Sequence, residues 1–208
     1  MQPFIEHARS LRLRIDRDGR RAEFGALAAG QSPMALFVTC SDSRVIPSLI
    51  TGSRPGDLFE LRTAGNAVPA YSHVRPGGDA ATIEYAVDVL RVPDLIVCGH
   101  SHCGAVGART RGDDLSALPA VDHWLTTQLP GDAGHEPPGA AARPGTADPG
   151  LHAAGQRNVR AQLERLHTYP CVRRRLGEGT LRLHGWFYGV DSGLVLSLDH
   201  ELGAFVPL

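Results

Sequence analysis

Two short apolar runs that end in clusters of cysteine, histidine and aspartate constrain this chain more than any other feature. Residues 34–39 lead into Cys40-Ser41-Asp42-Ser43-Arg44, and residues 94–98 lead into His100-Ser101-His102-Cys103. Runs of this length and composition predict buried strands. Two thiols and one imidazole at the ends of two strands make a three-ligand set, and zinc with three protein ligands keeps a fourth position open for water. The pattern therefore predicts a catalytic metal site rather than a structural one.

The order of elements between these runs predicts a parallel sheet. Residues 57–63 have the composition of a second strand, and residues 80–90 have a mostly apolar helical face that ends before Pro93. A strand, helix, strand order implies a right-handed crossover between parallel strands. Ligands in such sheets bind at the carboxyl ends of the strands, which is where Cys40 and His100 fall.

The remaining elements complete the expected fold. Helical spacing begins at Gly104 and continues to Leu125, and a further helix is predicted over residues 151–167. Residues 181–188 and 194–198 flank a glycine-containing turn and predict a hairpin. The expected fold class is α/β, with a mostly parallel central sheet, flanking helices and an antiparallel hairpin at the C-terminal edge.

We expect one domain over residues 1–208. The chain of 208 residues is 42% hydrophobic, which is enough for one well-buried core. Residues 1–29 form an N-terminal helical arm whose apolar stripe needs a partner surface, on the body or on a second subunit. Residues 130–150 are rich in proline and glycine and predict an exposed, flexible loop. A linker between two domains is less favoured, because the part that follows is too short for a second core.

Composition also limits the partners and the compartment. A net charge of -1 gives no broad attraction to nucleic acid or to an anionic membrane. No apolar stretch approaches the roughly 20 residues of a membrane span, and no signal-peptide pattern opens the sequence, so we expect a cytoplasmic protein. Of the four cysteines, Cys98 and Cys171 read as buried core residues. Two disulfides are conceivable, but a cysteine three residues after a histidine favours reduced, metal-binding thiols.

Several short motifs now occur in order along the chain: Gln31-Ser32-Pro33, Cys40-Ser41-Asp42-Ser43-Arg44, Pro55-Gly56-Asp57-Leu58-Phe59, Arg62-Thr63-Ala64-Gly65-Asn66, Glu84-Tyr85-Ala86-Val87, Gly99-His100-Ser101-His102-Cys103-Gly104-Ala105-Val106 and His184-Gly185-Trp186-Phe187-Tyr188. Each is weak alone. In this order and at this spacing they resemble the β-class carbonic anhydrases over nearly the whole chain. The resemblance implies a zinc enzyme that interconverts carbon dioxide and bicarbonate. It implies Cys40, His100 and Cys103 as ligands of one Zn²⁺ per subunit, and a homodimer as the minimal unit.

The expected chemistry follows from the metal and its neighbours. Zinc lowers the pKa of water enough to make hydroxide available near neutrality for attack on carbon dioxide. Two thiolates cancel the formal charge of the metal, so we expect a weaker Lewis acid than three imidazoles would leave, and activity that rises with pH.

Asp42 and Arg44 are the expected catalytic pair. Asp42 can accept a hydrogen bond from the hydroxide, and Arg44 can grip the carboxylate with two parallel bonds and keep it ionised. The pair can equally serve to hold the turn. The resemblance adds an inactive form in which Asp42 leaves Arg44 and replaces water on zinc.

The resemblance also places a substrate pocket. It assigns Gln31 as an amide donor to a substrate oxygen and Gly104 a position beside a zinc ligand. Phe59, Ala64 and Tyr85 are placed on the pocket wall, some of them reaching across the dimer interface. Without the motifs, Phe59 and Tyr85 would read as ordinary core residues.

Two positions depart from the family pattern. Thr63 stands where the family has asparagine, at a position that is not a ligand. Phe37 stands where a bicarbonate-regulated subclass has tryptophan, although Arg62 and Tyr188 match its other partners. Phenylalanine has no indole N–H to hold bicarbonate, so we expect the constitutively open subclass. His73 and His102 are proton-shuttle candidates, with solvated loop histidines as the simpler interpretation.

Two other functions remain open. The first keeps the fold and the zinc but acts on carbon disulfide or carbonyl sulfide, as some relatives of the family do. The second is a zinc-bound interaction protein without catalysis, which a missing member of the Asp42–Arg44 pair would favour; both residues are present.

Overall fold

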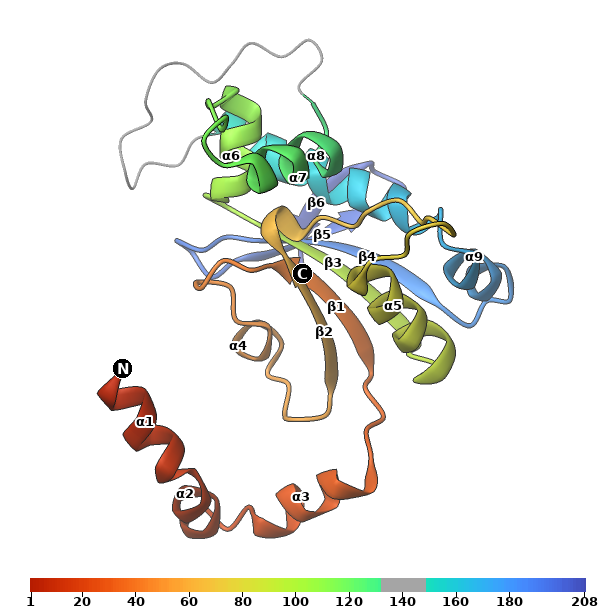
Figure 1. The fold of residues 1–208 in the computed structure, drawn as a ribbon. Coiled ribbons are helices and arrows are strands. Elements are labelled where there is room, and N and C mark those ends of the chain that lie inside the picture. Colours follow the sequence, from red (N-terminus) through yellow and green to blue (C-terminus); the bar gives the residue numbers. More distant parts are fainter. Residues whose placement is uncertain (132–148) are drawn as a thin grey trace.

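A six-stranded β-sheet in the order β2-β1-β3-β4-β5-β6 forms the centre of the protein (Figure 1). The structure is a computed structural model that describes residues 1–131 and 149–208. The strands are β1 (Ala35–Cys40), β2 (Leu58–Thr63), β3 (Asp94–His100), β4 (Arg182–Tyr188), β5 (Val195–Asp199) and β6 (Ala204–Pro207).

Strands β1 to β4 pair in parallel, and β5 and β6 pair antiparallel at one edge. The predicted α/β class, parallel sheet and C-terminal hairpin are therefore confirmed. The pattern did not reveal β6, whose four residues are too few to show an alternation.

Helices cover the sheet unevenly. Figure 1 shows α5, α8 and α9 against one face, α6 and α7 beyond its end, and α4 on the other side. The helices are α1 (Gln2–Arg9), α2 (Leu11–Arg17), α3 (Arg21–Ala26), α4 (Pro47–Thr51), α5 (Gly78–Glu84), α6 (Gly104–Arg111), α7 (Pro119–Gln128), α8 (Pro149–Leu166) and α9 (Pro170–Gly177). Short 3₁₀ turns at Leu27–Ala29 and Ala64–Asn66 and a π-helical turn at Tyr85–Val89 complete the secondary structure.

The helical spacing predicted to continue from Gly104 to Leu125 is interrupted. Helix α6 ends at Gly112, whose φ of 67° is left-handed and terminates the helix. A new helix begins at Pro119, in the first turn, where proline is tolerated. Periodicity alone could not separate two helices whose apolar residues happen to be in phase.

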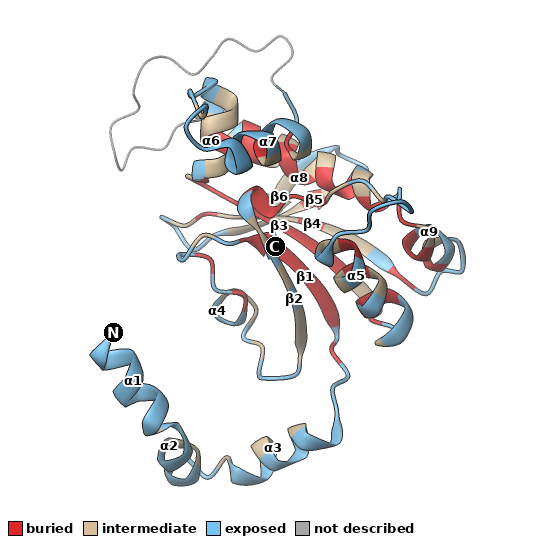
Figure 2. Ribbon diagram, viewed as in Figure 1, coloured by how far each residue is buried: buried red, intermediate tan, exposed pale blue. Residues whose placement is uncertain are grey.

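The main core lies between the sheet and its covering helices. Leu36 and Leu95 project from neighbouring strands, and Ile83, Leu166 and Tyr169 meet them from the helical layer, all fully buried. Figure 2 shows this buried layer running along the strands and the facing sides of the helices. A smaller cluster around Phe37 covers the opposite face of the sheet.

The two cysteines predicted to be core residues are buried. Cys98 is 0% exposed in the cluster around Phe37, and Cys171 is 4% exposed in the main core. Burial raises the pKa of the Cys98 thiol to about 12 and that of Cys171 to about 11. Both thiols therefore stay protonated and unreactive near neutral pH, as the prediction required.

The N-terminal arm is helical, as predicted, but lies apart from the sheet (Figure 1). No residue of α1, α2 or α3 is buried within the chain, and Phe4 and Leu13 are 77% and 70% exposed. The predicted loop over residues 130–150 falls largely outside the described residues, and its last two already belong to α8. In the part of the chain that the structure describes, no helix combines the length and apolar character needed to cross a membrane.

Helix α8 packs on β3 through a close backbone approach. A Cβ atom at Gly99 would lie 2.6 Å from Cγ2 of Val159 and 3.5 Å from the carbonyl oxygen of Gly155. Only glycine fits between strand and helix here. Gly99 immediately precedes His100. The contact therefore also sets how closely the end of β3 approaches α8.

Replacing Gly99 with alanine is expected to destabilise the protein by about 1–3 kcal/mol, because the added methyl group overpacks the contact with Val159. The matched control is Gly177→Ala at the end of α9, where an added Cβ would meet nothing within 4 Å. Urea denaturation of both variants gives the free energies of unfolding. A Gly99→Ala variant as stable as the wild-type protein would contradict the inferred close contact between β3 and α8.

Candidate functional site

The ends of β1 and β3 bring the two polar clusters together. Their parallel register pairs Thr39 with Cys98, so Cys40 and His100 finish adjacent strands at the same edge of the sheet. The Thr39 hydroxyl reinforces this pairing by donating to the Cys98 carbonyl at 2.9 Å. Cys103 follows three residues after His100 and caps the start of α6.

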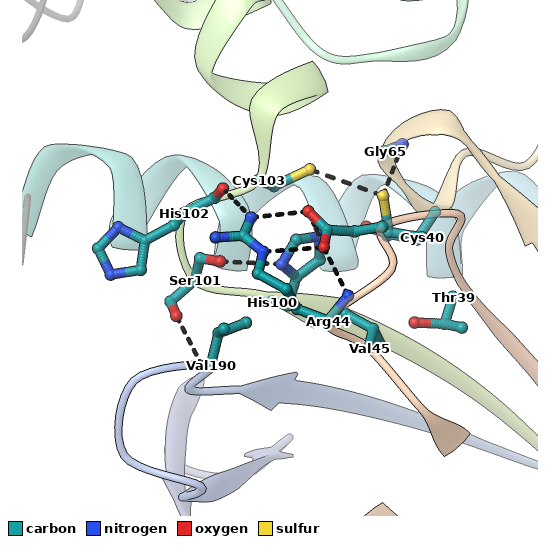
Figure 3. A network of polar contacts seen from close by, with 12 residues as sticks. Thr39, Cys40, Arg44, Val45, Gly65, His100, Ser101, His102, Cys103 and Val190 are labelled. Atoms are coloured by element: carbon teal, nitrogen blue, oxygen red, sulfur yellow. Dashed lines mark hydrogen bonds and ion pairs between the residues drawn. The ribbon is translucent and has the colours of Figure 1, made fainter. Parts of the chain in front are cut away.

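Cys40, His100 and Cys103 converge on one point, as Figure 3 shows. One ligand atom from each lies within 4.8 Å of the others, and all three residues are buried. The two sulfur atoms are 3.9 Å apart. Two thiolates bound at 2.3 Å to a tetrahedral ion are separated by about 3.8 Å, so the observed spacing fits zinc.

The orientation of His100 fits a metal ligand as well. Its Nδ1–H donates to the Ser101 carbonyl oxygen at 2.8 Å, which leaves the lone pair on Nε2. Nε2 is buried, and no hydrogen-bond partner for it exists among the described residues. A buried polar atom without a partner is costly, and a cation between the imidazole and the two thiols would satisfy it.

The two thiols are within hydrogen-bond distance of each other, with their sulfur atoms 3.9 Å apart. A hydrogen bond from Cys103 lowers the pKa of Cys40 to about 4, and the same contact raises the pKa of Cys103. The backbone N–H of Gly65 also donates to the Cys40 sulfur, at 3.4 Å. The lowered pKa of Cys40 favours its thiolate form, and a thiolate favours a bound cation.

Asp42 and Arg44 form a bidentate ion pair beside this cluster. Arg44 Nε donates to Asp42 Oδ1 at 2.9 Å, and Nη2 donates to Oδ2 at 2.7 Å. These bonds hold the pKa of Asp42 well below its usual range. Oδ2 also lies 3.9 Å from Nε2 of His100, so the carboxylate borders the space that the predicted ligands enclose. Arg44 further donates to the His102 carbonyl at 3.0 Å, tying the two polar clusters together.

Arg62 holds the turn after β1 from the neighbouring strand. Its guanidinium donates to the carbonyl oxygens of Cys40, Asp42 and Val45 at 2.7–3.1 Å. Sequence reasoning noted Arg62 only as a match to a bicarbonate-binding set and missed this role. This role depends on the register that pairs Arg62 with Thr39, and no signal in the sequence gave that register.

Comparison with known proteins identifies the family. A family model described as carbonic anhydrase matches residues 35–195. A carbonic anhydrase of Pseudomonas aeruginosa is 47% identical, over 94% of this chain and 88% of the relative. A solved structure, the β-carbonic anhydrase CcaA, is 37% identical with a TM-score of 0.86, covering 100% of this chain and 92% of that one. The chain belongs to the β-class carbonic anhydrases.

A further solved structure similar to this carbonic anhydrase comes from a protein described as tetrameric. A structure described as one of two tetrameric β-carbonic anhydrases from Sordaria macrospora is 26% identical with a TM-score of 0.76. The match covers 99% of this chain and 100% of that one. The enzyme class predicted from the motifs, carbonic anhydrase, is confirmed by these relatives.

The structure brings some of the predicted pocket residues of this carbonic anhydrase together. Phe59 and Tyr85 pack with ring centroids 5.9 Å apart, and Tyr85 remains 46% exposed. Gln31 is exposed before β1, and Gly104 is exposed at the start of α6. Ala64 alone among the five lines an open hollow of about 450 Å³, whose described lining residues are Ser41, Arg62, Thr63, Ala64, Ala120, Val121 and Trp124.

The structure shows what the side chains contact at the two positions that depart from the family pattern. Thr63 donates from its hydroxyl to the Ala67 carbonyl at 2.8 Å and so braces the turn after β2. Phe37 is fully buried, with its ring edge-on to Trp186 at 6.0 Å between centroids. The candidate shuttle histidines pack against aromatic rings, His73 against Tyr71 at 4.7 Å. Their role in proton transfer stays a prediction.

The Asp42–Arg44 pair gives this carbonic anhydrase a defined pH dependence of stability. Because the folded-state pKa of Asp42 is lowered, the pair stabilises the fold above the ordinary aspartate pKa of about 4, and this is lost as pH falls through and below that value. Arg44→Gln is expected to lower the free energy of unfolding by about 1 kcal/mol at pH 7, since Arg44 is half exposed. The difference should shrink below pH 4.

Denaturant titrations from pH 7 to pH 3 measure this difference. Arg75→Gln, at an exposed position, removes the same charge away from Asp42 and is the control. A stability loss in Arg44→Gln that stays constant across the whole range would contradict the assignment.

Proposed function

We propose that this enzyme hydrates carbon dioxide reversibly with a Zn²⁺ ion held by Cys40, His100 and Cys103, and with Asp42 and Arg44 as the catalytic pair. One observation carries the proposal. The unpartnered Nε2 of His100 faces two thiols, one of them readily ionised, and lies 3.9 Å from the carboxylate that Arg44 holds. A zinc ion held by these three residues would supply Lewis acidity that makes hydroxide available near neutral pH.

Asp42 orients the nucleophile in this proposal. Both of its oxygens are held by Arg44, so the carboxylate stays ionised and can only accept hydrogen bonds. Asp42 would accept the one proton of a hydroxide bound beside it, and this hydrogen bond would leave a lone pair of the hydroxide free for the substrate carbon. The Arg44-bound position of Asp42 supports the open form of the site rather than the form in which Asp42 occupies the metal.

Carbon dioxide needs a small apolar pocket with few donors. We place it beside Ala64, at the rim of the hollow next to Ser41. Gln31, Phe59, Tyr85 and Gly104 are the other proposed pocket residues. The exposure of Gln31 and Tyr85 supports the idea that a second subunit completes the pocket.

A homodimer is the proposed minimal unit. The exposed apolar side chains of the arm support it, because an amphipathic helix is stable only when its apolar stripe is covered. The tetrameric relatives from Sordaria macrospora lend further support. Two ionisable thiols at the centre also fit a reducing compartment, so we propose a cytoplasmic location.

Stopped-flow hydration of carbon dioxide tests the function. We expect rapid turnover that rises from neutral to alkaline pH, and a loss of roughly 10²-fold or more in Asp42→Asn, because the nucleophile is no longer oriented. Zinc content, measured on the same samples, should not change. Asp88→Asn removes an exposed carboxylate that pairs with Arg174 and should leave turnover intact.

Full zinc occupancy without hydration would overturn the proposal, and hydrolysis of carbon disulfide or carbonyl sulfide would then be assayed. Inactivity against all three substrates would favour a non-catalytic zinc protein.

Light scattering tests the assembly. The protein is expected to have at least twice the mass of one chain, and Leu13→Asp should lower that mass because it places a charge among the exposed apolar side chains of the arm. Val74→Asp changes an even more exposed apolar residue outside the arm and is the control. A monomeric wild-type protein would contradict the dimer.

A further inference from the structure

We propose that His102, His152 and Asp191 form a second divalent-metal site beside the predicted catalytic centre. Their ligand atoms lie within 4.8 Å of one another. The three residues come from distant parts of the chain: His102 from the turn after β3, His152 from the first turns of α8 and Asp191 from the turn between β4 and β5. Two imidazole nitrogens and one carboxylate oxygen are a donor set that zinc, cobalt and nickel accept.

The spacing within the cluster is too wide for hydrogen bonding and close to that of a shared ion. Nε2 of His102 lies 3.9 Å from Oδ1 of Asp191. Two such ligands on a tetrahedral ion are about 3.4 Å apart, so binding requires them to approach by a few tenths of an ångström. Both side chains are partly exposed, 24% and 52%, and can make this adjustment.

His152 supplies a buried nitrogen without a partner. Its Nε2 is inaccessible to solvent and has no hydrogen-bond partner among the described residues. The ring is held edge-on between His102, at 5.9 Å, and Phe187, at 5.6 Å between centroids. Ring packing alone explains these contacts but leaves Nε2 unsatisfied, whereas an ion bound through Nε2 would satisfy it.

His102 faces away from the first site. Figure 3 shows its imidazole pointing away from Cys103 and His100. The backbone of His102 has a φ of 56°, which is uncommon for a residue other than glycine and gives the side chain this direction. Its carbonyl oxygen accepts the hydrogen bond from Arg44, which fixes the peptide in that orientation.

Asp191 is fixed by the same turn. The Ser101 hydroxyl donates to Oδ1 of Asp191 at 3.2 Å and accepts from the backbone N–H of Val190 at 2.9 Å. The residue between His100 and His102 thus anchors the carboxylate of the second cluster. The cluster is therefore largely pre-formed, which lowers the entropic cost of binding an ion.

Equilibrium dialysis of the zinc-loaded protein against Zn²⁺ tests the site. The wild-type protein is expected to hold one more zinc ion per chain at saturation than either of two variants. His152→Phe keeps an aromatic ring against Phe187 but removes the ligand nitrogen, and Asp191→Asn keeps an acceptor for Ser101 but removes the charge. His123→Gln changes an exposed histidine on α7, outside the cluster, and should match the wild type.

The experiment measures the difference in zinc content between the wild type and each variant. The expected difference of one ion per chain is the same whether or not the cysteine site binds zinc. Equal zinc content in the wild type and both cluster variants would overturn the proposal. Binding beyond the cysteine site that rises without saturating would overturn it as well.

Cobalt identifies the ligands directly. Added to zinc-loaded wild-type protein, Co²⁺ should give visible d–d bands without thiolate charge transfer, and these bands should be absent in His152→Phe. Bands that carry thiolate charge transfer would instead locate cobalt at the cysteines and count against the second site.

Discussion

The parallel pairing of β1 with β3 is the constraint on which the site depends. It ends two buried strands at one edge of the sheet and places Cys40 and His100 side by side. Neither residue could reach the other from a single strand or helix, since 60 positions along the chain separate them. The backbone hydrogen bonds of the ladder and the Thr39 hydroxyl hold this alignment, and Arg62 secures the exposed turn through three carbonyl oxygens. Strand pairing therefore positions these side chains before any metal binds. Ligands carried on flexible loops would be held less precisely.

A buried amide network connects this edge to the helical layer. Gln162 on α8, fully buried, accepts from the backbone N–H of Val68 and donates to the Gln128 carbonyl and to Asn158. Asn158 in turn donates to the Gly65 carbonyl at 2.8 Å, and Gly65 donates its N–H to the Cys40 sulfur. Apart from the part-buried bond to Gln128, these bonds lie in the interior, so each missing one would leave a buried polar group unsatisfied. Helix α8 thus orients a donor to the Cys40 thiol through Asn158 and Gly65.

Features that depend on a few neighbouring residues were predicted from the sequence. The strands at residues 34–39 and 94–98 were predictable because buried parallel strands are short apolar runs, and the Cys40 and His100 clusters followed from where those runs end. The strand at residues 57–63 is only partly buried at the edge of the sheet, and its composition was enough to indicate it. The break at Gly112 was missed because the apolar spacing stays in phase across it. The carbonyl clamp of Arg62 could not be predicted, since it depends on the register between β1 and β2 rather than on residue type. The roles of the five proposed pocket residues remain predictions, and only Ala64 among them lines the described hollow.

The cluster of His102, His152 and Asp191 lay beyond sequence reasoning for a related reason. Its members come from three elements and form no motif, so only the packing of α8 against the ends of β3 and β4 joins them. The backbone conformation at His102 directs the side chains of residues 100–103 toward two different clusters. His100 and Cys103 face Cys40, while the left-handed conformation at His102 turns its ring to the opposite side. Ser101 contacts both groups, His100 through its carbonyl oxygen and Asp191 through its hydroxyl. An ion at the second cluster would consequently restrain the same turn that carries two of the proposed zinc ligands, so the two sites would share their rigidity through a single stretch of backbone.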